Sequence, residues 1–219
     1  ITIPEGLTSQ QVVKLIEAAP ALDGQLSAIP AEGSLLPETY DYIRSDTRDA
    51  LVRRMTKARN DALIKLWQRR TEGLPLADPQ AAAILASIVE KETASPEERP
   101  RIAAVFINRL RRDMRLQSDP TVVYALTGGK GPLGRPLTRK DLATDNPYNT
   151  YVIKGLPPGP IANPGSASLA AVLQPASTNE LYFVADGTGG HTFAKTLREH
   201  NRNVARWRRL QRQLKSRPK

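Results

Sequence analysis

The sequence predicts an α+β fold, in which helices pack with a small, mostly antiparallel sheet and long loops rich in Pro and Gly. Apolar residues recur at helical spacing through most of the first 112 residues. The second half holds short extended segments and most of the turn residues, and its clearest strand, residues 181–185, precedes the turn sequence DGTGG. A chain of 219 residues with 40% hydrophobic side chains is also long and apolar enough to bury a core.

Two helices are predicted in the first 74 residues. The first spans residues 8–17, where Thr8 and Gln11 form a capping box and the apolar positions share one face: Val12, Leu15, Ile16 and Ala19. The second spans residues 47–70, with an apolar stripe of Leu51, Met55, Leu63, Leu66 and Trp67. A connector follows at residues 73–78. We therefore predict an N-terminal helical subdomain at 1–74 and a second domain at 75–219 that includes the basic C-terminal helix.

The remaining elements are predicted from caps and periodicity. Residues 80–93 form the most hydrophobic helix, and the cap sequence Ser95-Pro96-Glu97-Glu98 begins another that runs to about residue 112. Residues 113–165 are rich in Gly, Pro, Asn and Asp and are expected to be loop, with an extended piece at 150–153. A short helix at 169–173, the strand at 181–185 and a final helix from Leu197 to Leu214 complete the chain.

Composition excludes several function classes. Eight of the 32 Lys and Arg residues follow position 201 and no Asp or Glu does, so the first 201 residues are nearly neutral although the whole chain carries a net charge of +10. This basic end is expected to extend the last helix, and no nucleic-acid partner is predicted. The chain has no Cys, and its two His lack zinc-site spacing, so no metal or cofactor is expected. No apolar run approaches the ~20 residues of a membrane span.

One apparent motif, GKGPLG at residues 129–134, matches the G-x-G-x-x-G pattern of dinucleotide-binding loops. That mechanism requires a strand before the loop and a helix that begins inside it, so that backbone amides face a pyrophosphate. No strong strand precedes residue 129, and Pro132 lacks an amide hydrogen. We therefore interpret the segment as an ordinary loop.

Glu92 is the strongest candidate for chemistry. Residues three and four apart share one face of a helix, so Glu92 continues the apolar face of Ile88 and Val89, whereas Glu90 lies on the other side. Desolvation and the negative end of the helix dipole both raise the pKa of such a carboxyl group. A glutamate with a pKa near ~6 can act as a general acid at neutral pH. The alternative is a solvated or ion-paired glutamate at a helix end, and Glu90 is interpreted as a scaffold acid.

Three other places could contact a ligand. Gln117 and Asp119 lie in a polar turn before Pro120, although Asp-Pro is also a common turn starter. Tyr148, Asn149 and Tyr151 precede a stiff proline-rich stretch at 157–164, a combination that suits a long polar ligand such as a sugar chain, with a structural loop as the alternative. His191, in the turn before Phe193, could bind a ligand or make a structural polar contact.

Several long sequence words resemble one family. LASIVEKET, FINRLRRDMRLQSDPTVVYAL, DNPYNTYVIKGLPPGPIANPG and LYFVADGTGGHTF occur in order across residues 80–201 and closely resemble the endolytic murein transglycosylases of the MltG (YceG-like) family. The N-terminal words ITIPEGLTSQQVV and LLPETYDY resemble the subdomain that precedes the catalytic part of that family.

The resemblance implies an enzyme that cleaves the β-1,4 bond between N-acetylmuramic acid and N-acetylglucosamine without water and leaves a 1,6-anhydro-muramyl end. It implies that Glu92, the second Glu of the E-K-E-T word, is the catalytic acid and base, and that no cofactor is needed. Gln117, Asp119, Tyr148, Asn149, Tyr151 and His191 are our candidates for binding the glycan strand. Ordinary glycosidases need two carboxylates, but here the C6 hydroxyl of the sugar is the nucleophile, so one is sufficient.

The resemblance also implies a setting. The family is anchored by an N-terminal helix at the periplasmic face of the bacterial inner membrane, so this chain, which starts at Ile1, is expected to be a catalytic fragment of a membrane-anchored parent. Peptidoglycan synthases and the elongation machinery are the protein partners it implies.

Two other functions and one other fold stay open at this stage. A muramidase-type hydrolase would use the same glycan with Asp119 as base and would add water. A non-catalytic module would bind glycan or nucleic acid through the proline-rich loop and the basic end. A lysozyme-like, mainly α fold is the alternative architecture, although function does not determine fold.

Overall fold

The computed structural model describes residues 1–215 and confirms an α+β fold, with helices and a small antiparallel sheet. The first four helices are α1 (Ser9–Ala18), α2 (Arg48–Gln68), α3 (Pro79–Glu92) and α4 (Arg99–Arg111). Three more follow: α5 (Asp119–Thr127), α6 (Arg139–Leu142) and α7 (Ser166–Leu173). The strands β1 (Tyr182–Ala185) and β2 (His191–Ala194) then precede α8 (Leu197–Lys215).

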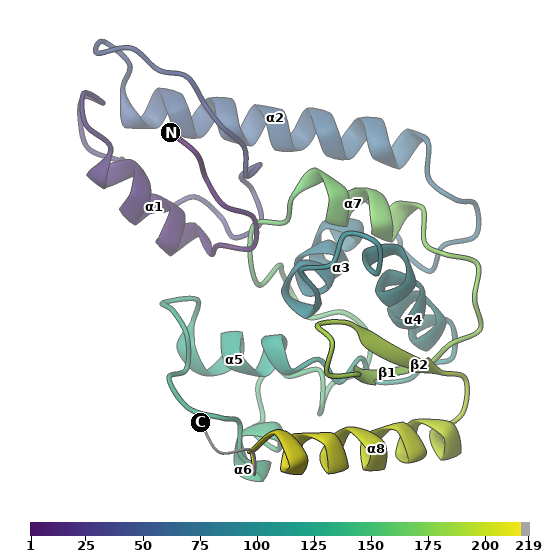
Figure 1. Ribbon diagram of the computed structural model, residues 1–219. Coiled ribbons are helices and arrows are strands. Elements are labelled where there is room, and N and C mark those ends of the chain that lie inside the picture. The colour runs from purple at the N-terminus through teal and green to yellow at the C-terminus, as the bar shows by residue number, and fades with distance from the viewer. Residues whose placement is uncertain (216–219) are drawn as a thin grey trace.

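Helix α3 is the centre of the larger hydrophobic core. It packs against α4 and α7, and α2 lies across the outer side of α7 (Figure 1). Every residue from Ala82 to Val89 is buried, so the one-sided apolar stripe that periodicity predicted is in fact a helix buried all round. Small residues make this burial feasible because they let neighbouring helices approach closely. Ser87, the polar member, donates its hydroxyl to the carbonyl of Ile84 (2.7 Å) and accepts the amide of Ile161 (3.0 Å).

A second, smaller core lies at the N-terminal end of the chain. The capping box of Thr8 and Gln11 begins α1 as predicted, and Val12 and Ile16 are buried there, but Leu15 is exposed. Three of the four residues predicted on the apolar face of this first helix are therefore buried, and Leu15 alone was assigned to the wrong side. Helix α2 joins the two cores, since Leu51 and Met55 belong to the smaller core and Leu63 to the larger. The domain boundary at residues 74 and 75 stays a prediction.

The sheet is a single hairpin. Strands β1 and β2 pair antiparallel with Phe183 opposite Phe193 and Ala185 opposite His191. The predicted strand at 181–185 corresponds to β1; Leu181 just before it is buried, and all four residues of β1 are half-buried. Helix α8 covers one side of the hairpin, as Figure 1 shows at the bottom of the molecule.

The structure differs from the sequence prediction in several places, including helix α6 within the expected loop and helix α7, which begins at Ser166 and not at residue 169. Helix α4 begins at Arg99. Residues 95–98 form a turn before it, and the carboxylate of Glu98 accepts two hydrogen bonds from His191. Helix α5 was missed because its Asp-Pro start was interpreted as a turn, although proline fits the first turn of a helix, where no amide hydrogen is required. Residues 150–153, expected to be extended, form turns.

Within residues 1–215, no helix is both long enough and apolar enough to cross a membrane. Arg217 and Lys219, which belong to the predicted basic end, lie outside the described residues.

Candidate active site

Glu92 is the last residue of α3, and its side chain lies at the junction of α3, α5 and the loop before α5. The side chain is half-buried, and the hydroxyl of Ser118 donates a hydrogen bond to its Oε1. Glu90, two residues earlier, points to the other side of the helix, where it accepts the amide of Gly165 (2.9 Å) and pairs with Arg99 (3.4 Å). The structure therefore separates the two acids as helical periodicity predicted, with Glu90 in a scaffold role.

The pKa of Glu92 is raised to about 7. Desolvation by the surrounding protein is the main cause, and the negative charge of Asp119 raises the pKa further. The hydrogen bond from Ser118 and the charges of His191 and Arg109 act in the opposite direction, because they stabilise the carboxylate. A carboxyl group in this range can both give and take a proton near neutral pH.

The segment that carries Gln117, Ser118 and Asp119 is fastened to residues 149–151. The backbone amide of Gln117 donates to the carbonyl of Thr150 (3.1 Å), and the backbone amide of Ser118 donates to the Thr150 hydroxyl (3.0 Å). The Tyr151 hydroxyl donates to Asp119 Oδ1 (2.5 Å). Gln117 has a φ of 52°, a left-handed conformation that is uncommon for a residue with a side chain. The contacts with Thr150 and Tyr151 hold this backbone in place beside Glu92.

Asn149 orders the loop of residues 142–151 that holds the Gln117 segment. Its side chain is completely buried, and its amide group donates to the carbonyls of Leu142 (3.2 Å) and Thr144 (2.8 Å). Its side-chain oxygen accepts the amide of Tyr151 (3.0 Å). All of these contacts are with backbone, so Asn149 orders the loop and has no free face toward a ligand.

A cavity of about 620 Å³ lies in front of Glu92. Gln117, Asp119 and Tyr151 line it on one side, and Phe183 and Val184 of β1 line it on another. The far wall is α8, which contributes His200, Val204, Trp207, Arg208 and Gln211. The helix that sequence analysis treated as a basic end therefore forms part of the site.

Arg109 lies at the base of this cavity and is buried. Its guanidinium donates to the carbonyls of Leu181 (2.7 Å) and Leu116 (2.8 Å) and contacts the side-chain oxygen of Gln117 (3.4 Å). Burial lowers the pKa of Arg109, and the negative charge of Glu92 partly opposes this effect. Arg109 thus joins Leu181, the residue before β1, to the Gln117 segment and supplies a positive charge near the carboxyl group of Glu92.

Tyr148 and His191, like Asn149, lie outside the cavity lining. The ring of Tyr148 packs against Tyr124, with 4.9 Å between ring centroids. His191 directs Nδ1 to Glu98 (2.7 Å) and packs edge-on against Phe183. Its electrostatic effect still reaches Glu92. Gln117, Asp119 and Tyr151 are therefore brought together with Glu92, whereas Tyr148, Asn149 and His191 stand behind them.

Sequence reasoning missed Ser118, Arg109 and Trp207. Ser118 stood beside the candidates Gln117 and Asp119, so its neighbourhood was flagged but its contact with Glu92 was not. Arg109 was one of several basic residues in a helix, with no local signal that it is buried. Trp207 lies within the predicted final helix, where no local signal indicated that it lines a cavity.

Comparison with known proteins gives concordant results. Residues 1–206 match the family model of the YceG-like family. An endolytic murein transglycosylase of Bacillus subtilis is 40% identical over 174 residues, which cover 79% of this chain and 47% of that protein. An endolytic murein transglycosylase of Streptococcus pneumoniae strain R6 is 37% identical over 210 residues, covering 92% of this chain and 37% of that protein. The chain thus spans less than half the length of these curated relatives.

A solved structure is also similar. The crystal structure of a YceG-like protein from Listeria monocytogenes superposes with a TM-score of 0.71 at 36% sequence identity, covering 92% of this chain and 74% of that chain.

Proposed function

Because the chain belongs to the YceG-like family, we propose that it is a lytic transglycosylase of murein. It cleaves the bond between N-acetylmuramic acid and N-acetylglucosamine within a glycan strand and forms a 1,6-anhydro-muramyl end. One observation carries the proposal: a half-buried glutamate with a pKa raised to about 7 borders a cavity of about 620 Å³. The names of the Bacillus and Streptococcus relatives support the same activity.

The reaction needs one proton carrier used twice. Protonated Glu92 gives its proton to the glycosidic oxygen as the bond to C1 of the muramyl residue breaks. The resulting carboxylate then takes the proton of the C6 hydroxyl while the C6 oxygen bonds to C1. Glu92 ends in its starting state, and no water is consumed. Because nucleophile and electrophile belong to one sugar, the attack gains the advantage of an intramolecular reaction.

The neighbours of Glu92 suit this cycle. Ser118 holds Oε1, which leaves Oε2 to carry the proton and lowers the free energy of the carboxylate formed in the first step. The carboxylate of Asp119, held by Tyr151, can stabilise the positive charge that develops on the sugar ring. The side chain of Gln117 lines the cavity, and its amide group can form hydrogen bonds with the glycan. Tyr148, Asn149 and His191 act as positioning residues behind this surface.

The hydrolase alternative keeps a specific observation in its favour: Asp119 lines the same cavity as Glu92. In that mechanism Asp119 would activate a water molecule, and the product would carry a reducing end. The two mechanisms therefore differ in product mass by one water.

Digestion of purified sacculi followed by mass spectrometry tests the proposal. Wild-type protein should release anhydro-muropeptides, and Glu92→Gln should abolish the release while retaining the fold. Glu72→Gln is the matched control, because Glu72 is an exposed glutamate in the loop after α2. Reducing ends that are lost in Asp119→Asn would establish the hydrolase instead, and retained activity in Glu92→Gln would refute the assignment of the acid.

The proposed substrate also implies a location. Murein lies outside the cytoplasm, so the enzyme would work on the extracytoplasmic side of the membrane, with an anchored parent and murein synthases as its proposed setting. No nucleic-acid partner is proposed; one side of α8 covers the hairpin and forms a wall of the cavity.

A further inference from the structure

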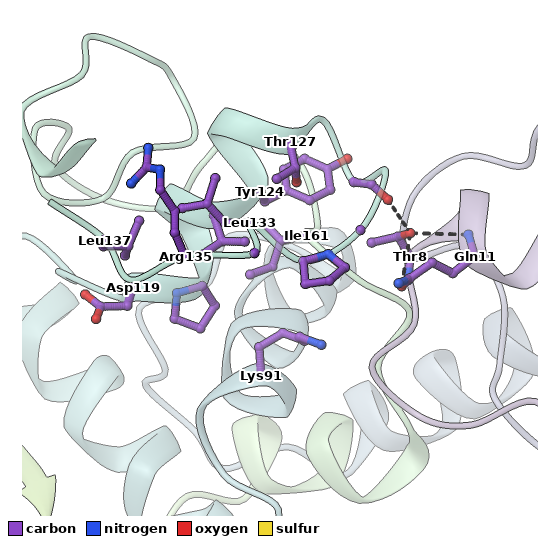
Figure 2. Close-up of a pocket in the computed structure, with 16 residues that line it drawn as sticks. Thr8, Gln11, Lys91, Asp119, Tyr124, Thr127, Leu133, Arg135, Leu137 and Ile161 are labelled. Atoms are coloured by element: carbon purple, nitrogen blue, oxygen red, sulfur yellow. Dashed lines mark hydrogen bonds between the residues drawn. The ribbon is translucent and has the colours of Figure 1, made fainter. Parts of the chain in front are cut away.

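A second cavity, of about 720 Å³, lies on the other side of Asp119 from the Glu92 cavity. One face of α5 forms a wall, the loop of residues 129–137 closes over it, and the N-terminal end of α1 bounds it (Figure 2). Asp119 lines both cavities. The proposed reaction uses only the first of them, so the second has no assigned role.

The end of α3 presents consecutive residues to the two cavities. Glu92 faces the first and Lys91 the second. Successive residues point about 100° apart around a helix, which gives this divergence directly. A sugar that reacts at Glu92 could therefore direct a substituent past Asp119 toward Lys91 without leaving the protein surface.

The second cavity is mainly aliphatic, with one available cation. Val123, Leu133, Leu137 and Ile161 contribute its apolar surface. Arg135 also lines it, but its guanidinium is held by the carboxylate of Asp141 (2.6 and 2.9 Å). Lys91 instead donates to the backbone carbonyl of Gly6 (3.0 Å), and no carboxylate of residues 1–215 pairs with it. An ammonium group has three donors, so Lys91 can also bind an anion.

The loop over this cavity is held in place before any ligand binds. The Thr8 hydroxyl donates to the carbonyl of Gly129 (2.6 Å), and the Gln10 side chain donates to that of Gly128 (3.1 Å). A Cβ at Gly129 would approach the Tyr124 ring to 3.0 Å, and its φ is 75°, so glycine is required there. The G-x-G-x-x-G segment thus follows the end of a helix and roofs a mainly apolar cavity, unlike a phosphate-binding loop.

We propose that this second cavity binds the acidic stem peptide of the muramyl residue that reacts at Glu92. The peptide is attached to the muramyl sugar through a lactyl group and carries alanine methyl groups and free carboxylates. The aliphatic walls match the methyl groups, and Lys91 matches a carboxylate. Further sugar rings would suit the surface less well, because they present hydroxyl groups to walls whose surface is mostly apolar. The inference rests on the proposed function for the identity of the substrate.

Binding of a soluble probe tests the inference without any turnover. The probe is N-acetylmuramoyl-L-alanyl-D-glutamate, and its analogue with both carboxylates amidated is the charge control. Lys91→Met should weaken binding of the probe about tenfold, the loss expected for one charge-assisted hydrogen bond, with little effect on the diamide. Leu133→Glu should weaken it as well, since it adds a negative charge to an exposed loop rather than to the core. Lys130→Met is the matched control, because Lys130 is exposed on the same loop but does not line the cavity.

The outcomes separate this inference from the proposed function. Equal affinity of all variants for the probe, or the same loss for the diamide as for the probe, would overturn the inference. Rates on murein and on glycan strands stripped of peptide give a second measurement: the ratio of the two rates should fall in Lys91→Met. Failure of the wild-type protein to release anhydro ends from either substrate would refute the proposed function, whereas the binding result would stand.

Discussion

The substitution Glu92→Gln should change the pH dependence of stability as well as activity. The folded protein raises the pKa of this carboxyl group from its ordinary value of 4.5 to about 7, mainly by desolvation. Glutamine has nearly the same shape and can still accept the hydrogen bond of Ser118, but it has no charge to bury. The variant therefore removes one titration from the folded state and leaves the packing in place.

The sign and size follow from linkage. Below pH 4.5 the carboxyl group is protonated in both the folded and the unfolded chain, and it has no effect. Between pH 4.5 and 7 the unfolded chain ionises first, so the wild-type protein loses stability as the pH rises, and above pH 7 the loss is complete. At about 1.4 kcal/mol per pH unit, this range corresponds to about 3 kcal/mol. The figure is an upper value, because the half-buried side chain is partly screened by water.

Urea unfolding at several pH values between 4 and 8 measures this effect. Trp67 packs against the larger core and Trp207 lines the Glu92 cavity, so tryptophan fluorescence reports on both regions. The free energy of unfolding of Glu92→Gln minus that of the wild type should be near zero at pH 4 and rise to as much as about 3 kcal/mol at pH 8. Glu72→Gln should show no such rise, because its exposed side chain is not desolvated on folding.

A difference that stays constant from pH 4 to pH 8 would refute the reasoning, because it would mean that folding does not desolvate the carboxyl group of Glu92. A difference that falls with pH would reverse the sign and indicate a carboxylate stabilised by Arg109.

Three further results are expected. The kcat/KM for murein should fall above about pH 7, where Glu92 loses its proton. Ser118→Ala should move that fall to higher pH, because it removes a hydrogen bond that stabilises the carboxylate. The pH–rate profiles of the wild type and the variant check both expectations. Asn163→Ala should lower the free energy of unfolding by about 3 kcal/mol, measured by urea unfolding, because this buried side chain bonds Leu7, Ser9, Glu32 and Leu35 at once. Truncation after Thr196 should abolish glycan cleavage, and truncation after Leu210 should weaken it, because the longer fragment keeps Trp207 in the cavity wall and loses Gln211.

Much of the fold could be predicted because the signals of a helix, its caps and the spacing of its apolar residues, lie within a few neighbouring residues. The capping box at Thr8 and the apolar spacing in α2 and α3 gave correct helices to within about two residues. The errors arose where a local signal had two meanings. Asp119-Pro120 begins a helix as readily as a turn. Ser95 was predicted to cap α4, but the helix begins four residues later, after Glu98, whose carboxylate contacts His191.

In the candidate site, too, local patterns predicted some residues, whereas tertiary packing alone placed the others. Glu92 could be chosen from periodicity alone, because the direction of a side chain on a helix depends only on its place in the turn. Its partner Ser118, the buried cation Arg109 and the α8 wall could not, because they approach Glu92 only when distant segments pack together. The burial of Asn149 likewise depends on carbonyls that only the folded loop brings to it.

The sequence by itself determined most of the helices, the separation of Glu90 from Glu92 and the concentration of positive charge at the C-terminal end. The tertiary structure decided what those features do. It set the charge-bearing helix against the hairpin as a wall of the Glu92 cavity, and it opened a second cavity beside Lys91. The physical reason is range: helix periodicity and caps act over a few residues, whereas desolvation and cavity shape depend on contacts between segments far apart in the chain.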